Sequence, residues 1–402
     1  MKGSPQLFFF VLLTSQIPPA SGQVDVSADL EKIRVRFHMP GLSAMAVKNG
    51  RLVAQGAAGY RRQGDNWPLL ISDRINIGSC TKWMTATVAG RLVDRGQIGW
   101  STRVRDLFTN YENFNPAFFD VTLDQLLAHR AGIEDRDTFE NRHWSQLMTQ
   151  NGTISRIRRW VAESVLKDAP QVRPGEYLYS NQGYAVAAAM LEMASGKNWE
   201  TLIKEEVFRP VGMKTATLGI VYDDKRPPKN PVGHYLTFGA TLPVPEEAMV
   251  PKELYRYQAA NGAGGFVICT LQDWTKFLSI HAGNSNYLSR NTAKRLREAY
   301  PGPPGPDGEN YGRGVFVDDR DWARPGPALD HNGDIFGHET VFWMAPARGF
   351  IGVVFTNCFS RDKSTFRALD SAAVLVTPND SFRTGKLRFG EHPPRSSSAQ
   401  RR

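Results

Sequence analysis

Strand patterns at opposite ends of this 402-residue sequence constrain its fold more than any other feature. Near the start, residues 42–58 form two apolar segments around Asn49-Gly50, a dipeptide that strongly favours a tight hairpin turn. Near the end, residues 335–357 contain two more strand-like segments joined by a second turn. Helical patterns fill much of the sequence between them. Distant segments therefore have to meet in one sheet.

The interior of the sequence is mostly helical in pattern. Within residues 103–213, Thr122 and Gln125 have the spacing of a capping box at the start of a helix. Strands at both ends with helices between them predict an α+β fold, in which helices flank an antiparallel sheet built from N- and C-terminal segments. A mostly helical subdomain is expected as an insertion at residues 103–260. A functional site would lie between the sheet and this insertion.

Three local patterns near the C-terminal half complete the prediction. Residues 261–267 are rich in glycine and predict a turn; no Lys-Ser or Lys-Thr follows them, so they do not form a phosphate-binding loop. Residues 311–317 are expected to form a strand, and residues 364–375 a final helix.

The two ends of the sequence differ from the domain between them, which is predicted to span residues 23–385. Residues 1–22 combine Lys2, a short apolar run and small residues, as in a cleaved signal peptide. The run is shorter than the about 20 apolar residues that span a bilayer. We therefore expect a secreted or periplasmic protein without an integral membrane span once the signal is removed, with an uncleaved anchor as the alternative. Residues 386–402 are expected to be a disordered basic tail.

Composition narrows the class of partner. The net charge of +9 is spread along the sequence, and no basic run with interleaved aromatic residues suggests a nucleic-acid groove. A mild preference for anionic substrates or surfaces stays open. The oligomeric state cannot be read from the sequence.

The cysteines and sequons leave alternatives open. Cys80, Cys269 and Cys358 are too few for a disulfide scaffold and lack metal-ligand spacing. One pair would bridge in an oxidising compartment, and the sequence does not choose which. Asn151 and Asn379 begin glycosylation sequons, which matter only in a host that glycosylates secreted proteins.

The first candidate catalytic pair follows a small-residue turn and opens a helical pattern that is expected to end near Gly96. Ser79 and Lys82 are three positions apart, which on a helix places both side chains on one face, about 5–6 Å apart at Cβ. A serine needs a base or a favourable field to act as a nucleophile. The helix N-terminus supplies part of that field and Lys82 the rest. The same spacing recurs at Ser360 and Lys363 without other support, so the pair alone is weak evidence.

Two further groups of residues have chemistry that complements this pair. Tyr179 and Asn181 flank one residue, so both can point to the same side of an extended or sharply turned segment. A nearby ammonium would lower the pKa of the tyrosine, and the asparagine amide offers both a donor and an acceptor. By itself this tripeptide is more often a buried tyrosine followed by a turn.

The last group, His331 to Asp334, opens a predicted edge strand. A strand beside Ser79 would lend a backbone N–H to an oxyanion hole, in which each donor is worth about 2.7–4 kcal/mol. Gly333 permits close approach of a substrate, and His331 would add a hydrogen bond or a positive charge. A single histidine in this position is more often structural, so its assignment depends on the other groups.

In this order, Ser79-x-x-Lys82, Tyr179-Ser180-Asn181 and His331-Asn332-Gly333 resemble the three motifs of the class C β-lactamase-related serine hydrolases. That family includes β-lactamase-like esterases, D-aminopeptidases and D,D-carboxypeptidases. Residues 126–132 are similar to its Leu-Leu-x-His-x-Ser-Gly element, and residues 209–213 to its Pro-Leu-Gly-Met element. The resemblance covers residues 35–357.

The resemblance implies a β-lactamase/transpeptidase-like fold and an acyl-enzyme mechanism without metal or cofactor. Ser79 would attack a carbonyl, while Lys82 and Tyr179 move protons. Asn181 would orient the substrate, and His331 would stand where the third motif has its basic residue. The N–H groups of Ser79 and Asp334 would form the oxyanion hole, beside Gly333.

Three departures from the family pattern refine this expectation. His331 replaces the lysine of true β-lactamases, which favours an esterase or peptidase. Asp334 places a carboxylate near the expected oxyanion hole, where it would repel an anionic substrate and slow the reaction, unless strand alternation points it away. Ala131 replaces the usual serine of the helical element and is expected to matter little.

The predicted function is therefore an exported serine hydrolase that cleaves a small-molecule or peptide-like ester or amide. A catalytically silent binding or scaffold protein with the same fold, and a cell-wall D,D-peptidase, are the alternatives. Specificity would lie in loops such as residues 222–251, which carry no readable code.

Overall fold

The computed structural model describes residues 23–221, 227–237, 240–244, 251–283, 285–306, 308–360 and 364–376. The predicted signal peptide, the predicted basic tail and the sequon at Asn379 lie outside the described residues, as does much of the expected specificity loop at 222–251. No described helix has the length and apolar character that crossing a membrane requires.

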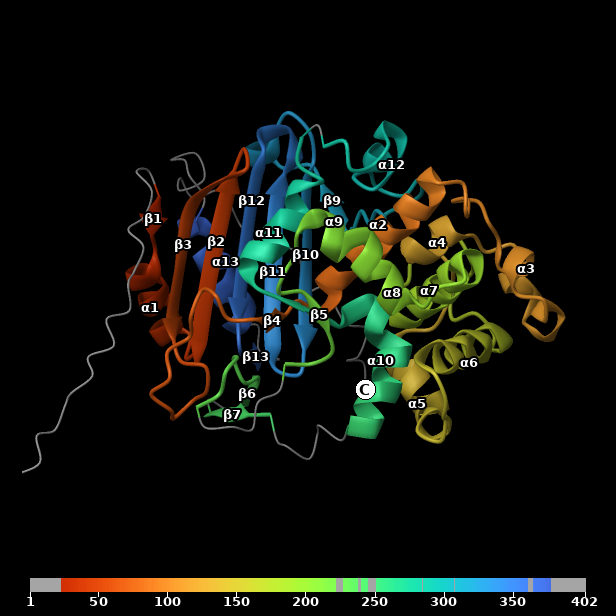
Figure 1. Cartoon of the computed structure of the whole chain (residues 1–402), viewed down its shortest axis with the longest axis horizontal. Coiled ribbons are helices and arrows are strands. Elements are labelled where there is room, and N and C mark those ends of the chain that lie inside the picture. Colours follow the sequence, from red (N-terminus) through yellow and green to blue (C-terminus); the bar gives the residue numbers. More distant parts are fainter. Residues whose placement is uncertain are drawn as a thin grey trace, which may run out of the picture.

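A seven-stranded sheet occupies one side of the molecule (Figure 1). Its strand order is β1-β3-β2-β12-β11-β10-β9, and all neighbours are antiparallel except the short β1 with β3. The predicted antiparallel sheet from N- and C-terminal segments is confirmed. Its strands are β1 (Val24–Asp25), β2 (Gly41–Lys48), β3 (Arg51–Gly59), β9 (Phe316–Asp318), β10 (Ala328–Ile335), β11 (His338–Ala345) and β12 (Phe350–Thr356).

Local turns and one long-range pairing build this sheet. Asn49 and Gly50 have φ values of 49° and 75°, as a two-residue hairpin turn requires, and Lys48 pairs with Arg51 across it. The predicted C-terminal hairpin joins β11 to β12 through η7 (Pro346–Arg348). β12 then pairs with β2 along their whole lengths. The two ends of the chain are thereby joined edge to edge.

Helices cover both faces of the sheet, so β2 is buried along almost its whole length. On one face, Leu42 and Ala44 join the apolar cluster that contains Leu369 of α13 (Ser364–Val376) and Leu30 of α1 (Ser27–Arg36). Met45 points to the other face, where α11 (Leu271–Ser279) packs. A strand that is buried on both faces reads as a continuous apolar run instead of an alternating one.

The second layer is a block of helices beside the sheet (Figure 1). Its central helix, α7, is buried from Gln182 to Leu191, and α2, α6 and α10 pack around it. The predicted capping box at Thr122 and Gln125 is confirmed. The helices are α2 (Thr81–Asp94), α3 (Val104–Leu107), α4 (Leu123–Leu127), α5 (Arg136–Leu147), α6 (Ile154–Lys167), α7 (Asn181–Ser195), α8 (Trp199–Ile203), α9 (Arg209–Val211), α10 (Pro251–Gly265) and α12 (Arg290–Arg295).

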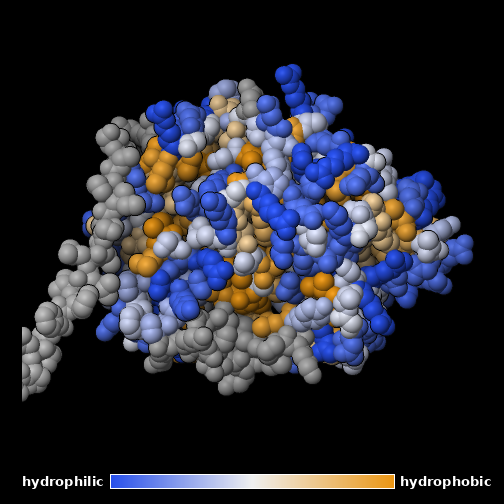
Figure 2. Space-filling view, viewed as in Figure 1, coloured by the Kyte–Doolittle hydropathy of each residue, from blue (hydrophilic) through white to orange (hydrophobic). Residues whose placement is uncertain are grey.

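Shorter elements connect the two layers. Two three-stranded sheets have the orders β4-β8-β5 and β13-β6-β7. Their strands are β4 (Ile75–Asn76), β5 (Thr217–Leu218), β6 (His234–Thr237), β7 (Ala240–Pro243), β8 (Val267–Cys269) and β13 (Phe359–Ser360). On the face drawn in Figure 2, hydrophilic side chains cover most of the described surface, with apolar side chains in scattered groups.

Two local predictions are wrong. Residues 261–267 do not form a turn, because α10 continues to Gly265. Its glycines serve close packing: a Cβ on Gly264 would lie 3.2 Å from Lys82 Nζ. The expected strand at 311–317 is reduced to β9, with Tyr311 forming only an isolated bridge to Phe316. In both segments, contacts with distant residues override local pattern.

Candidate active site

Ser79 and Lys82 lie where the helical block meets the sheet. Ser79 belongs to the short 3-10 helix η1 (Gly78–Cys80), which leads directly into α2. Lys82 Nζ lies 3.0 Å from Ser79 Oγ, 2.7 Å from Asn181 Oδ1 and 3.0 Å from the Gly264 carbonyl oxygen. The lysine side chain is completely buried, whereas Ser79 is partly exposed. The structure thus brings together three segments, at η1, α7 and α10, around one amine.

Burial lowers the pKa of Lys82 to about 7. The charge of Asp334 opposes this shift, and that of Arg136 adds to it. Near neutral pH the amine is therefore often unprotonated. Asn181 Oδ1 and the Gly264 carbonyl only accept hydrogen bonds, so they hold the two N–H groups of the neutral amine. Its lone pair is then directed at the Ser79 hydroxyl.

Tyr179 and Asn181 reach the same amine from the start of α7. Ser180 is the N-cap of this helix, and its Oγ accepts a hydrogen bond of 3.1 Å from the Gly183 N–H. This cap fixes the chain so that Asn181 becomes the first helical residue. The ring of Tyr179 is centred 4.8 Å from Lys82 Nζ, and its side chain is partly exposed. Both predicted residues therefore contact Lys82.

Gly333 is in direct contact with the backbone of η1. A Cβ at this position would lie 2.2 Å from the Ile77 carbonyl oxygen and 2.7 Å from Ser79 N. Gly78, with φ of 49°, would likewise bring a Cβ to 2.7 Å from Asp334 N. Only glycine fits at either position. The backbone nitrogens of Ser79 and Asp334 consequently lie close together beside the nucleophile.

The edge of β10 is open next to Ser79. In the described chain, β9 pairs only with residues 328–330 of β10. From His331 onwards, this edge faces the site. Along the strand, Asp334 lies on the opposite face from Gly333 and stands across from Glu339 of β11. Asp334 is exposed. Strand alternation turns this carboxylate away from Gly333, but its charge still acts on Lys82.

His331 is buried and bonded on both sides of its ring. Its Nδ1 lies 2.5 Å from the Asn332 carbonyl oxygen and its Nε2 lies 3.0 Å from Tyr311 Oη. A carbonyl only accepts, so Nδ1 carries hydrogen, and in a neutral imidazole the Tyr311 hydroxyl donates to Nε2. The ring is centred 6.2 Å from that of Tyr179. These bonds direct both ring nitrogens to other groups of the protein.

Two aromatic residues that motif analysis did not select complete the wall of the site. His129 is buried, and its Nδ1 accepts a hydrogen bond of 3.1 Å from the Ser180 N–H. Burial holds the pKa of His129 well below its ordinary value, so the ring is neutral. Its ring lies 4.2 Å from that of Tyr179 and 4.7 Å from that of Tyr311. The Leu-Leu-x-His element pointed to His129, but nothing in the sequence placed Tyr311.

The cysteines neither bridge nor compete with Ser79. All three are buried thiols, and no disulfide joins them. Cys80 Sγ lies 3.4 Å from the His331 carbonyl oxygen, on the inner side of η1. Burial raises the pKa of Cys80 far above its ordinary value. Its thiol therefore stays protonated.

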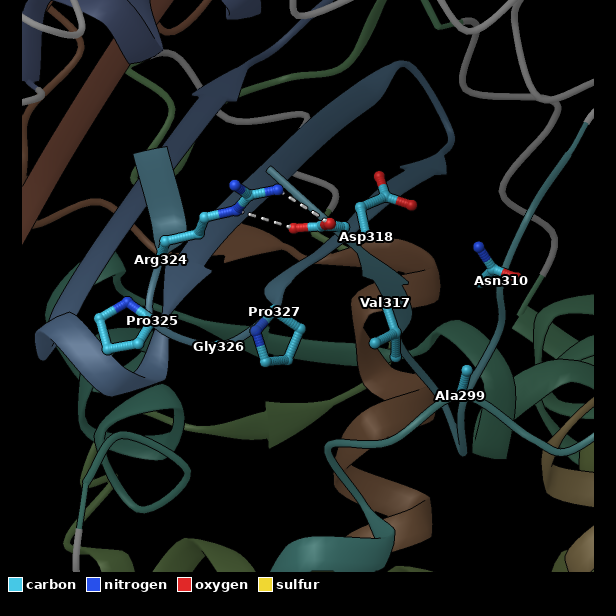
Figure 3. A pocket seen from close by; sticks show the side chains of 9 residues that line it. Ala299, Asn310, Val317, Asp318, Arg324, Pro325, Gly326 and Pro327 are labelled. Atoms are coloured by element: carbon cyan, nitrogen blue, oxygen red, sulfur yellow. Dashed lines mark hydrogen bonds and ion pairs between the residues drawn. The ribbon is translucent and has the colours of Figure 1, made fainter. Parts of the chain in front are cut away.

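A hollow on the described surface lies elsewhere. It has a volume of about 730 Å³ and is formed by the end of β9 and residues 324–327 (Figure 3). Arg324 reaches across it to Asp319 at 3.2 Å. None of the predicted site residues lines it. An exposed ion pair and two prolines supply no nucleophile, so the hollow is not the catalytic centre.

Comparison with known proteins supports a relationship across the chain. Residues 27–376 match the family model described as Beta-lactamase. Penicillin-binding protein 4 of Amycolatopsis lactamdurans is 23% identical over 81% of this chain and 83% of its own length. A D-aminopeptidase of Cereibacter sphaeroides is 27% identical over 49% of this chain and 36% of its own. The matches to several other relatives likewise cover less than half of those proteins.

Solved structures share the fold. The D-amino acid amidase of Ochrobactrum anthropi SV3, in complex with L-phenylalanine amide, superposes with a TM-score of 0.66 at 21% identity, covering 87% of this chain and 97% of its own. EstCE1, a hydrolase with promiscuous acyltransferase activity, gives a TM-score of 0.69 at 17% identity, covering 86% and 97%. The family match spans both layers of the fold and every predicted site residue. The chain belongs to the β-lactamase family and is a β-lactamase-related serine hydrolase.

Proposed function

We propose that the protein cleaves an ester or amide through an acyl-enzyme on Ser79. The observation that carries this proposal is the environment of Lys82: a completely buried amine, 3.0 Å from Ser79 Oγ, with a pKa lowered to about 7. A general base acts best when its pKa lies near the working pH. The other two contacts of the amine, to Asn181 and Gly264, aim its lone pair at the serine.

In the first half of the reaction, Lys82 Nζ takes the proton of the Ser79 hydroxyl as Oγ bonds to the substrate carbonyl carbon. The resulting oxyanion accepts hydrogen bonds from the N–H groups of Ser79 and Asp334, each worth about 2.7–4 kcal/mol. Collapse of this intermediate breaks the bond to the leaving group, which receives a proton from the lysine directly or through Tyr179. The acyl group stays on Ser79.

In the second half, water replaces the leaving group. Lys82 takes a proton from the water, directly or through the Tyr179 hydroxyl, as the water attacks the acyl carbon, and the proton returns to Ser79 Oγ as the acyl bond breaks. Asn181 holds Lys82 and offers its amide N–H₂ to the substrate. Every proton is thus exchanged among groups within the site, and the scheme requires no metal or cofactor.

The substrate class follows from the charges around the open edge of β10. His331 has both ring nitrogens directed to Asn332 and Tyr311, so neither nitrogen is available to bind a substrate carboxylate on this strand. The negative charge of Asp334 lies close enough to influence Lys82. We therefore favour neutral or amine-bearing esters and amides over β-lactams with a free carboxylate. Export belongs to the same proposal and rests only on the sequence pattern of residues 1–22.

Intact-mass spectrometry after incubation with a fluorophosphonate tests the nucleophile. A single adduct is expected on the wild type, none on Ser79→Ala and very slow labelling of Lys82→Ala. Ser360→Ala is the matched control, because Ser360 has the same spacing to a lysine; its labelling should equal that of the wild type. A folded wild type without an adduct would support the silent binding or scaffold protein instead.

Paired substrates then separate the hydrolase classes. A peptide ending in two D-alanines is offered with a free carboxylate and as its methyl ester, beside D-amino-acid amides and neutral esters. Preference for the blocked peptide, the amides or the esters supports the proposal. Faster cleavage of the free acid would identify a D,D-peptidase and contradict the assignment of substrate charge.

A further inference from the structure

We propose that Glu134, His143 and Asp168 form a binding site for a divalent transition-metal ion of the Zn²⁺ type, outside the catalytic centre. The three residues come from separate segments of the helical block. Glu134 precedes α5, His143 lies within α5, and Asp168 caps the end of α6. These two helices pack against each other (Figure 1).

The ligand atoms already converge. His143 Nε2 lies 2.8 Å from Asp168 Oδ2 and 3.5 Å from Glu134 Oε1, and the ligand atoms of all three residues are within 4.8 Å of one another. Tetrahedral zinc with bonds of about 2.0–2.2 Å places its ligand atoms about 3.3 Å apart. The cluster therefore needs only small side-chain rotations to receive an ion. One imidazole and two carboxylates leave room for a water as the fourth ligand.

One carboxylate of the cluster is incompletely satisfied. The side chain of Glu134 is only 3% exposed, and within the described chain its Oε1 makes no hydrogen bond. Leaving a buried oxygen of this kind without a partner is costly. A cation between the three side chains would remove this cost.

Arg142 is the competing cation. Its Nη1 lies 3.2 Å from Glu134 Oε2 and 3.4 Å from Asp168 Oδ2, both long for hydrogen bonds. The arginine side chain is 51% exposed, so it can swing into solvent when an ion enters.

The cluster is bonded to the catalytic segment. The backbone carbonyl of Glu134 accepts a hydrogen bond of 2.6 Å from Ser180 Oγ, and Ser180 stands between Tyr179 and Asn181. Fixing Glu134 with an ion would steady this serine and, through it, the start of α7. The ion would thus act as a positioning group and take no part in the chemical steps.

Zinc titration of the purified, chelator-treated chain tests the site. Calorimetry is expected to show one saturable site on the wild type, with a matching rise in the thermal midpoint of unfolding. Co²⁺ should give a visible absorption band from nitrogen and oxygen ligands. Zinc binding and the Co²⁺ absorption band should vanish in His143→Ala and weaken strongly in Glu134→Gln. Glu163→Gln, on α6 but outside the cluster, should bind like the wild type.

Arg142→Ala separates a metal site from an ion-pair network. Removal of the competing guanidinium should tighten zinc binding, and zinc should restore the stability lost with the arginine. A wild type without saturable zinc binding, or binding unchanged in both His143→Ala and Asp168→Asn, would overturn the proposal. Since these readouts are binding and stability, they are independent of whether Ser79 is catalytic.

Discussion

Lys82 and Arg158 are both cations buried so completely that neither side chain reaches solvent, yet their surroundings differ. Arg158 forms ion pairs with Glu192 and Glu200. Burial alone would lower the pKa of Arg158, but these carboxylates raise it above its ordinary value. Lys82 instead bonds to a hydroxyl, an amide oxygen and a backbone carbonyl, all neutral. Its pKa falls to about 7.

The difference shows what makes a buried cation structural or reactive. Two carboxylates hold the proton on Arg158, so its charge is permanent and its function is to join α6 to α7 and α8. Neutral acceptors hold Lys82 in place and favour its charged form much less than carboxylates would. At Lys82, the contacts that fix the position of the amine therefore do not also give it a high pKa. The following predictions test that distinction.

The largest effect is expected when Lys82 is replaced by a cation that cannot lose its proton. Lys82→Arg keeps the charge but removes the base, so kcat/KM should fall by about 10²–10⁴-fold. Steady-state kinetics on an ester found with the wild type measure the loss, and circular dichroism checks the fold. Activity within a few-fold of the wild type would show that a neutral amine is unnecessary.

Replacing Arg158, the structural cation, should instead lower the stability of the protein. Arg158→Met leaves Glu192 and Glu200 buried without their partner, so the free energy of unfolding should fall by about 3–5 kcal/mol. Urea unfolding measures it. The corresponding change at the other site, Lys82→Met, should leave stability at pH 7 unchanged or raised. Equal losses of stability in Arg158→Met and Lys82→Met would contradict the distinction between a structural and a reactive buried cation.

Asn181→Asp gives Lys82 a carboxylate neighbour, as Arg158 has. A carboxylate at the position of the amide favours the ammonium and should raise the pKa of Lys82 by about 1–3 units. The rising limb of kcat/KM, expected near pH 7 in the wild type, should move to higher pH. Asn198→Asp, at the exposed N-cap of α8, is the control and should leave the profile in place. A profile unmoved in Asn181→Asp would exclude Lys82 as the titrating base.

The smallest effect is a slope of stability with pH. The folded pKa of Lys82 is about 7 and its ordinary value is 10.5. Between these values the unfolded chain binds more protons, so the free energy of unfolding should rise with pH, by up to about 1.4 kcal/mol per unit. Below the folded pKa, the free-energy cost of burying the protonated Lys82 is fully present and no longer changes with pH. The slope of the wild type minus that of Lys82→Met isolates this group; a difference of zero would contradict the lowered pKa.

Local chemistry explains which parts of the molecule were predictable. Asn49-Gly50 specifies its own turn, and Thr122 with Gln125 specifies its own cap, because all the interacting atoms lie within a few residues. The shared face of Ser79 and Lys82 likewise follows from helical spacing. Such features can therefore be predicted from the sequence alone.

Long-range contacts explain the errors. The glycines of α10 led to the prediction of a turn. Gly264 instead allows Lys82 to approach, and this is a contact between distant segments that the local pattern does not show. The hydrogen bond between the His331 ring and Tyr311 could likewise not be read from the sequence. Packing against distant residues, which the sequence does not reveal, decided both cases.

The pairing of β2 with β12 also determines when the catalytic centre can form. Met45 stands opposite Val353, so this contact closes only after a ribosome has made almost the entire domain. The Ser79 turn also lacks its contacts with β10 and β11 until residues 328–345 have been made. Such non-local contacts make folding slow and expose unpaired strand edges meanwhile. The proposed catalytic centre can therefore be completed only at the end of folding.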